Sequence, residues 1–460
     1  MPTNRRRSTL LFLAFCYILT LGTSAGFAQT MSCHESSEDW TVPCPPAEDL
    51  FDMRYQVDFR PVSGPRKMTL SGIEFVAAIF ENQAFQCGFE GNANALLLEV
   101  CDDGICEEFS SETKALWVLL HPGGGGYFDV DSTPEHPIYQ KGSPLAPTSG
   151  TIENSQKSPG YLQGVFSDHL QTDPVQSNPL IQQLVDRTYV LAGQGVRFLV
   201  PATCDHDIHA GVGTIYPRKP VSVDGWSSDT TVDGLLADLS AIDFIANPVH
   251  GSGIATSLVV LHGTSAGAYG AFAIAATLHK VEGRDVNAVI ADSSLASERF
   301  DHLFHQTDQP DCTRGQLSNP ELDLCRLEEK IGHFFCNPNL FPESAVRSGF
   351  DIPYFDIASG NDQRCCGGSP AISAALDDDG YPDTEPNNCE WMHNGLRQAL
   401  ALKPLQQSIT YAACSPLQED DCPNGQYHDH VVTKRPGPWN DDLIRWLDAS
   451  IDDTTLGPWE

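Results

Sequence analysis

The residues best suited to chemistry lie in one short run, His262 to Gly267, which reads His-Gly-Thr-Ser-Ala-Gly. A serine flanked by glycines two positions away on either side can occupy a tight turn, because the glycines have no side chains to clash. An apolar segment (257–261) precedes the run and an alanine-rich segment (266–278) follows it, and these predict a strand and a helix. The helix would direct its positive end at the turn. We therefore predict that Ser265 is a nucleophile that attacks carbonyl groups.

A second feature is a run of four glycines, Gly123 to Gly126, which follows the apolar segment 115–120. Backbone N–H groups at the end of a strand can complete an oxyanion hole, and glycine lets the backbone approach a substrate closely. No Gly-Lys-Ser/Thr follows, which excludes a P-loop and leaves a flexible turn as the alternative. Together with Ser265, the run favours an oxyanion hole.

A serine of ordinary pKa needs a general base, and the base needs an orienting carboxylate. Behind a serine turn of this type they are expected in the order acid, then histidine. Asp362 follows a predicted strand (352–355) and is our candidate acid, whereas Asp356 lies closer to the strand and is assigned a structural role. For the base we favour His428 over His430; both precede a predicted C-terminal helix.

The elements that must position these residues alternate between apolar strands and helices. The expected strands cover residues 93–100, 115–120, 189–191, 197–200, 257–261, 286–291 and 352–355. The expected helices cover residues 232–245, 266–278 and 443–447. Strands that are apolar throughout imply a mostly parallel sheet with helices on both faces, so the sequence predicts an α/β fold.

The N-terminus has the pattern of a secretory signal peptide, which we assign to residues 1–28. Three arginines at 5–7 precede a short apolar stretch (10–21) and then small residues up to Ala28. A membrane anchor is the alternative, but the stretch is short for a bilayer. No later stretch is long and apolar enough to cross a membrane, so we expect a soluble, secreted protein.

Residues 29–460 predict a single α/β catalytic domain, preceded by a disulfide-stapled arm that extends to about Pro65. Two irregular segments, near 299–350 and 365–390, are interpreted as disulfide-rich insertions that could cap the site. Of the 15 cysteines one lies in the signal peptide, and the remaining 14 are an even number, typical of disulfides in an oxidising compartment. Cys101 and Cys106 could close a small loop.

Acidic residues dominate the charge: 61 Asp and Glu stand against 27 Lys and Arg, a formal net charge of −34. Such a surface repels polyanions, which excludes nucleic acid and anionic membranes as partners. Residues 377–383 are rich in aspartate, but Ala375 and Pro386 stand where an EF-hand needs acids, so the segment predicts an acidic turn or a weak Ca²⁺ site. Residues 205–209 (Asp-His-Asp-Ile-His) are more typical of a hydrogen-bonded pocket wall than of a metal site.

Several of these motifs resemble those of the pectinacetylesterase/Notum family of α/β-hydrolases. The similar features are the glycine run with Tyr127 after it, the Gly-Thr-Ser-Ala-Gly around Ser265, and Pro353 nine residues before Asp362. The resemblance extends over roughly residues 116–446. It implies a catalytic triad and an oxyanion hole of backbone N–H groups, formed respectively by Ser265, Asp362 and His428, and by Gly124, Gly125 and Ala266.

The resemblance implies a secreted serine ester hydrolase that removes O-acetyl or other acyl groups from a carbohydrate or similar substrate. Such a reaction proceeds through an acyl-enzyme and requires no cofactor. Two alternatives remain open at this point. One is a non-catalytic secreted binding protein on the same fold, and the other is a carboxylesterase or lipase for long acyl chains.

Overall fold

The computed structural model of the 460-residue chain describes its sheet, three helices and some connections. The described residues are 57–70, 72–87, 91–101, 106–120, 127–129, 138–140, 167–168, 176–177, 195–201, 209–211, 214–215, 231–232, 234–247, 252–292, 346, 349–359, 406–411 and 438–451. The predicted signal peptide and nearly all of both predicted insertions lie outside these residues, as does the expected strand at 189–191.

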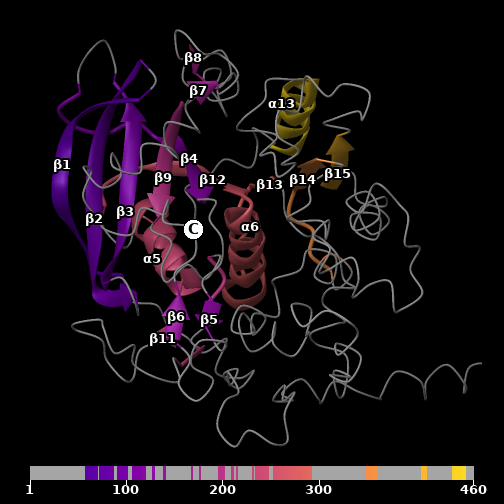
Figure 1. Cartoon of the computed structure of the whole chain (residues 1–460). Helices are drawn as coiled ribbons and strands as arrows, with labels where there is room; N and C mark the ends of the chain where they lie inside the picture. Colours follow the sequence, from indigo (N-terminus) through magenta and orange to yellow (C-terminus); the bar gives the residue numbers. More distant parts are fainter. Residues whose placement is uncertain are drawn as a thin grey trace, which may run out of the picture.

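A nine-stranded sheet forms the centre of the molecule, in the order β1-β2-β3-β9-β4-β12-β13-β14-β15 (Figure 1). Its strands are β1 (Phe59–Leu70), β2 (Ile73–Cys87), β3 (Gly91–Val100), β4 (Lys114–Leu120), β9 (Val196–Pro201), β12 (Thr256–Thr264), β13 (Ala288–Asp292), β14 (Tyr354–Ser359) and β15 (Gln406–Tyr411). The pairings from β1 to β9 are antiparallel, and those from β9 to β15 are parallel. The carboxyl ends of the six parallel strands therefore share one edge.

Three two-stranded ribbons lie outside this sheet. They pair β5 (Tyr127–Asp129) with β6 (Ile138–Gln140), β7 (Ser167–Asp168) with β8 (Gln176–Ser177), and β10 (Thr214–Ile215) with β11 (Thr231–Val232). All three are antiparallel and lie in long connections between strands of the main sheet.

Helices cover both faces of the sheet, and this confirms the predicted α/β fold. The described helices are α5 (Gly234–Ala246), α6 (Ala266–Thr277), a π-helical turn η4 (Leu278–Glu282) and α13 (Pro438–Ser450). None of them is long and apolar enough to cross a membrane. Alternate residues of β4 show the two layers: Leu116, Val118 and Leu120 belong to the core with α5 and α6, whereas Ala115, Trp117 and Leu119 belong to the core with α13.

Helix α6 is buried almost all round, which explains its composition of alanine and glycine. A helix that is apolar on every side belongs in the interior, and small side chains let it lie close to the strands. Its largest fully buried side chain, Phe272, packs against Phe350 and Tyr354, with ring centroids 4.9 and 5.5 Å apart. The predicted helix at 266–278 is thus confirmed, although its last residue already belongs to η4.

Three strands of the main sheet have no counterpart among the expected ones: β1, β2 and β15. The predicted arm was expected to reach about Pro65, but β1 already begins at Phe59 and pairs with β2. Most of β1 is exposed, with only Phe59 and Met68 buried, so it lacks the apolar pattern of a core strand. Strand β15 reads Gln-Gln-Ser-Ile-Thr-Tyr and is similarly polar. Both are edge strands, where one side of the strand has no neighbour in the sheet.

The predicted small disulfide loop is confirmed, because Cys101 and Cys106 are bonded to each other. The loop lies in the connection between β3 and β4. Disulfides involving the cysteines of the predicted insertions lie outside the described residues.

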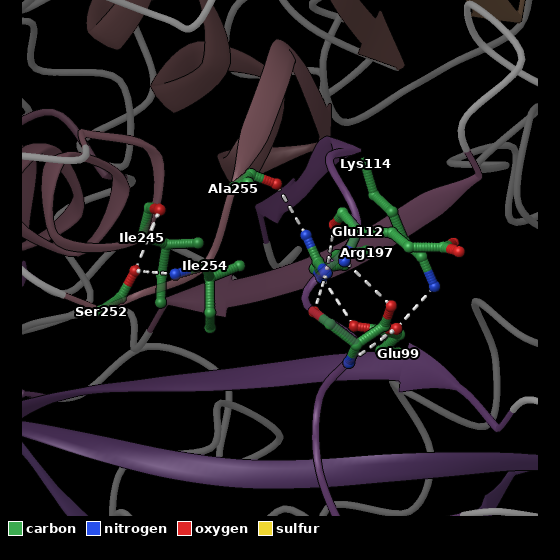
Figure 2. A network of polar contacts seen from close by, with 9 residues as sticks. Glu99, Glu112, Lys114, Arg197, Ile245, Ser252, Ile254 and Ala255 are labelled. Carbon is green, nitrogen blue, oxygen red and sulfur yellow. Dashed lines mark hydrogen bonds and ion pairs between the residues drawn. The ribbon is translucent and has the colours of Figure 1, made fainter.

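A buried ionic network joins four neighbouring strands at the amino edge of the parallel sheet, opposite Ser265 (Figure 2). Glu99 of β3 accepts hydrogen bonds from Lys114 Nζ of β4 at 2.5 Å and from Arg197 Nε of β9 at 2.6 Å. All three side chains are less than 10% exposed. The Arg197 guanidinium also donates to three backbone carbonyls, those of Ala255, Ser110 and Glu112. One carboxylate thus neutralises one of two buried cations, and carbonyl dipoles solvate the excess charge.

We expect Glu99→Gln to lower the free energy of unfolding by about 3–5 kcal/mol, since it leaves two buried cations without a counter-charge. The measurement is urea unfolding at neutral pH. The matched control is Glu74→Gln, because Glu74 forms an ion pair with Lys67 at the surface. That change should cost under about 1 kcal/mol. Equal effects of the two substitutions would contradict a stabilising role for the buried charge.

Candidate active site

Ser265 occupies a strained turn between β12 and α6. Its φ is 53° and its ψ is −116°, and among the described residues only His209 shares a positive φ without being glycine. Such a conformation costs on the order of 1–3 kcal/mol and persists only where the surroundings impose it. Here the Ser265 N–H donates to the carbonyl of Asp292 at 2.7 Å, and the Ser265 carbonyl accepts the Ala268 N–H at 2.9 Å. The side chain is half-buried.

The turn is so tight that Gly263 touches the backbone beyond the serine. A β-carbon on Gly263 would lie 1.8 Å from the carbonyl oxygen of Gly267 and 2.6 Å from the Ala268 nitrogen. Both distances are far below a van der Waals contact. The structure therefore explains why a glycine stands two residues before the serine: no other side chain fits between the strand and the helix.

Of the three predicted oxyanion residues the structure describes Ala266, together with the end of the strand that precedes the glycine run. Leu120, the last residue of β4, pairs with Gly263 of β12, and the glycine run begins three positions after Leu120. Gly124 and Gly125 themselves lie outside the described residues. Ala266 is the first residue of α6 and is buried. N–H groups in the first turn of a helix have no partner within the helix, and they carry its positive end.

The predicted acid and base, Asp362 and His428, also lie outside the described residues, as does His430. The strands before them are placed: β14 ends at Ser359 and β15 ends at Tyr411, both at the carboxyl edge where Ser265 stands. Asp356 is fully buried within β14. The structure thus brings together Ser265, Ala266 and the strand that leads to the glycine run.

Of the predicted pocket wall at 205–209, the structure describes only the last residue, His209. His209 Nδ1 lies 2.8 Å from Asp238 Oδ2 of α5, and both side chains are fully buried. Burial raises the pKa of Asp238, and the neighbouring His209 partly offsets this. No group of three or more His, Cys, Asp or Glu side chains that could hold a metal occurs in the part of the chain that the structure describes. The acidic turn at 377–383 lies outside that part.

Sequence reasoning missed two residues that bear on the serine turn. Asp292, at the end of β13, supplies the carbonyl that holds the Ser265 N–H. His262, on β12, accepts a hydrogen bond from Trp117 of β4 inside the core. A backbone carbonyl leaves no signature in a sequence, and the two partners in the second contact are 145 residues apart.

A serine held on such a turn between a buried parallel strand and a helix has the geometry that a nucleophile elbow requires. The chain matches no protein-family model and no curated protein sequence. Among solved structures it is similar to an S-formylglutathione hydrolase from Agrobacterium tumefaciens, with a TM-score of 0.36 and 10% identity over 85% of this chain and 99% of that one. It is also similar to a glucuronoyl esterase from Solibacter usitatus, with a TM-score of 0.40 and 11% identity over 90% and 89%. These likenesses are too distant to assign a family or an activity.

Proposed function

We propose that the protein is a serine ester hydrolase with Ser265 as its nucleophile. The observation that carries this proposal is the conformation of Ser265, which is strained at a positive φ on a turn that Gly263 alone makes possible. Strain of this type is retained where it serves a function, here the exposure of a hydroxyl at the positive end of α6. The carboxyl edge of the sheet, which holds the serine, is also where α/β folds bind their ligands.

The proposed mechanism is two-step acyl transfer. Neutral His428 takes the hydroxyl proton as Ser265 Oγ bonds to the ester carbonyl carbon, and Asp362 orients the imidazole. Backbone N–H groups stabilise the negative charge on the carbonyl oxygen; we assign them to Gly124, Gly125 and Ala266. The intermediate collapses as the C–O bond to the alcohol breaks and His428 returns the proton to the leaving oxygen. Water then hydrolyses the acyl-enzyme by the same sequence of steps.

We further propose that the substrate is an acylated carbohydrate or similar compound outside the cell. The motif resemblance to the pectinacetylesterase/Notum family supports removal of O-acetyl or other acyl groups, and the signal-peptide pattern supports secretion. The net charge of −34 disfavours a strongly anionic polymer as the substrate unless cations screen it.

The test is labelling of the secreted, disulfide-bonded protein with a fluorophosphonate, followed by mass spectrometry of the labelled peptide. We expect a single phosphonylated serine, Ser265, and hydrolysis of p-nitrophenyl esters that is fastest for acetate. If esters with long acyl chains are hydrolysed fastest, the protein is instead a lipase or long-chain carboxylesterase. Absence of both labelling and hydrolysis in folded protein would overturn the enzyme assignment.

A further inference from the structure

One buried polar atom near the serine, Nε2 of His262, has no hydrogen-bond partner among the residues that the structure describes. His262 lies on β12 three residues before Ser265, and its side chain is in the core, with a relative exposure of 2%. Buried polar groups are almost always paired, so an orphan of this kind on the strand that carries the proposed nucleophile requires an explanation.

The other ring nitrogen of His262 decides where its proton lies. Nδ1 is 3.2 Å from Nε1 of Trp117, and the two rings are nearly perpendicular, at 76°. An indole nitrogen can only donate a hydrogen bond, so Nδ1 must accept it and the imidazole proton lies on Nε2. The contact therefore exists only while His262 is neutral. A second proton on Nδ1 would set two donors against each other.

This contact ties together the two strands that form the proposed site. Trp117 is on β4, which leads to the glycine run, and His262 is on β12, which leads to Ser265. In the strand register Trp117 pairs with Val260, and His262 pairs with Leu119, so the hydrogen bond crosses diagonally between neighbouring rungs. A shift of either strand would break it.

We propose that neutral His262 is a positioning residue that, through Trp117, keeps β4, which leads to the glycine run, aligned with β12, which leads to Ser265, and that protonation of His262 releases this alignment. The inference rests on the proposed function for its catalytic part. Its structural part, an acid-sensitive tie between two core strands, stands independently of any activity.

Most of the described residues around His262 are apolar. On the same face of the sheet lie apolar residues of β4, β13, β14 and α13, among them Leu119, Ile290 and Trp446. By alternation Asp292 of β13 is on this face too, two positions beyond Ile290. The charged residues of α13 that the structure describes, Asp442, Arg445 and Asp448, are partly or fully exposed.

Burial alone lowers the pKa of His262 to about 4, from about 6.5 in the unfolded chain. Between these two pH values His262 is protonated in the unfolded chain but stays neutral in the folded protein. The stabilising contribution is therefore complete above about pH 6.5 and is lost as the pH falls towards 4. Acid should therefore weaken the hydrogen bond between Trp117 and His262, independently of the protonation state of the proposed catalytic base.

The first experiment reads the tautomer and the acid transition directly. In protein labelled with ¹⁵N-histidine, NMR should place the His262 proton on Nε2 at pH 7.5. Tryptophan fluorescence should report an acid transition between pH 6.5 and 4 that moves to lower pH in His262→Asn, which keeps an acceptor but cannot be protonated. His279→Asn, a matched change in a half-buried histidine outside the sheet, should leave the transition in place. A proton on Nδ1, or equal transitions in all three proteins, would overturn the tie.

The second experiment measures catalysis on p-nitrophenyl acetate at pH 7.5. Trp117→Phe keeps the ring but removes the donor, and it should lower kcat roughly three- to tenfold with KM unchanged, as for the loss of one hydrogen bond. His262→Asn should retain kcat within about twofold. An unchanged kcat in Trp117→Phe would sink the positioning role. If wild-type protein hydrolyses nothing, the proposed function fails, and the NMR and fluorescence results still decide on the tie.

Discussion

Ser265→Ala should lower kcat/KM for p-nitrophenyl acetate by about 10⁴- to 10⁶-fold and abolish fluorophosphonate labelling. The reason is that no other group can form the covalent intermediate, so only the oxyanion hole and binding remain. The fold should be unchanged, because alanine has the same β-carbon as serine and meets the same constraint at φ 53°. Steady-state kinetics and near-UV circular dichroism on the same preparation check both expectations.

The matched control is Ser257→Ala on the same strand. Ser257 is buried near the amino end of β12, and within the described part of the chain its hydroxyl has no hydrogen-bond partner. Its replacement should change kcat/KM by less than about twofold, because the residue touches neither the turn nor its neighbours. Loss of activity in both variants would mean that β12 tolerates no change, and retention of activity in Ser265→Ala would refute the nucleophile.

The substitution Ser265→Gly separates the cost of backbone strain from the loss of the reactive hydroxyl. Glycine adopts positive φ at little cost, so Ser265→Gly should raise the free energy of unfolding by about 1 kcal/mol or more while removing activity. An inactive but more stable variant would show that the serine is retained at the expense of stability, as functional residues often are.

The parts of the fold that could be predicted are those with a simple apolar pattern. Strands β4 and β12 are buried on both faces, so their central residues, 115–120 and 258–261, are apolar, and α6 has the composition of a helix with no exposed side. The edge strands β1 and β15 have polar sequences, and most of β1 is exposed to water. Their pairing is decided by the rest of the sheet and not by their own residues.

The candidate site likewise contains residues that a local motif predicts and contacts that no local motif predicts. Ser265 and Gly263 could be predicted because the turn imposes its requirements within five consecutive residues. Other contacts join distant parts of the chain: Trp117 bonds to His262 on the strand before the turn, and Arg197 bonds to Glu99 at the opposite edge of the sheet, across 145 and 98 residues. No local pattern records such partners. The acid and the base are predicted from chain order alone, so Asp362 and His428 stay predictions.

Gly263→Ala should remove most of the activity without touching any reacting group. Its β-carbon would fall 1.8 Å from the Gly267 carbonyl oxygen, and backbone on both sides prevents the conflict from being relieved by a side-chain rotation. The first turn of α6 must move by more than 1 Å, and displacements of that size at a reacting centre cost about 10²-fold in rate. We also expect unfolding to become easier by about 1–3 kcal/mol, as for overpacking.

Gly253→Ala is the matched control for that substitution. Gly253 precedes β12, has a φ of +72°, and has nothing within 4 Å of where its β-carbon would stand. Alanine there should cost about 1 kcal/mol of stability through backbone strain alone and leave kcat unchanged. Full activity in Gly263→Ala would mean that the elbow geometry does not govern the reaction, and the nucleophile would have to be sought elsewhere. Loss of activity in Gly263→Ala alone would link the rate to the close approach of strand and helix at the serine.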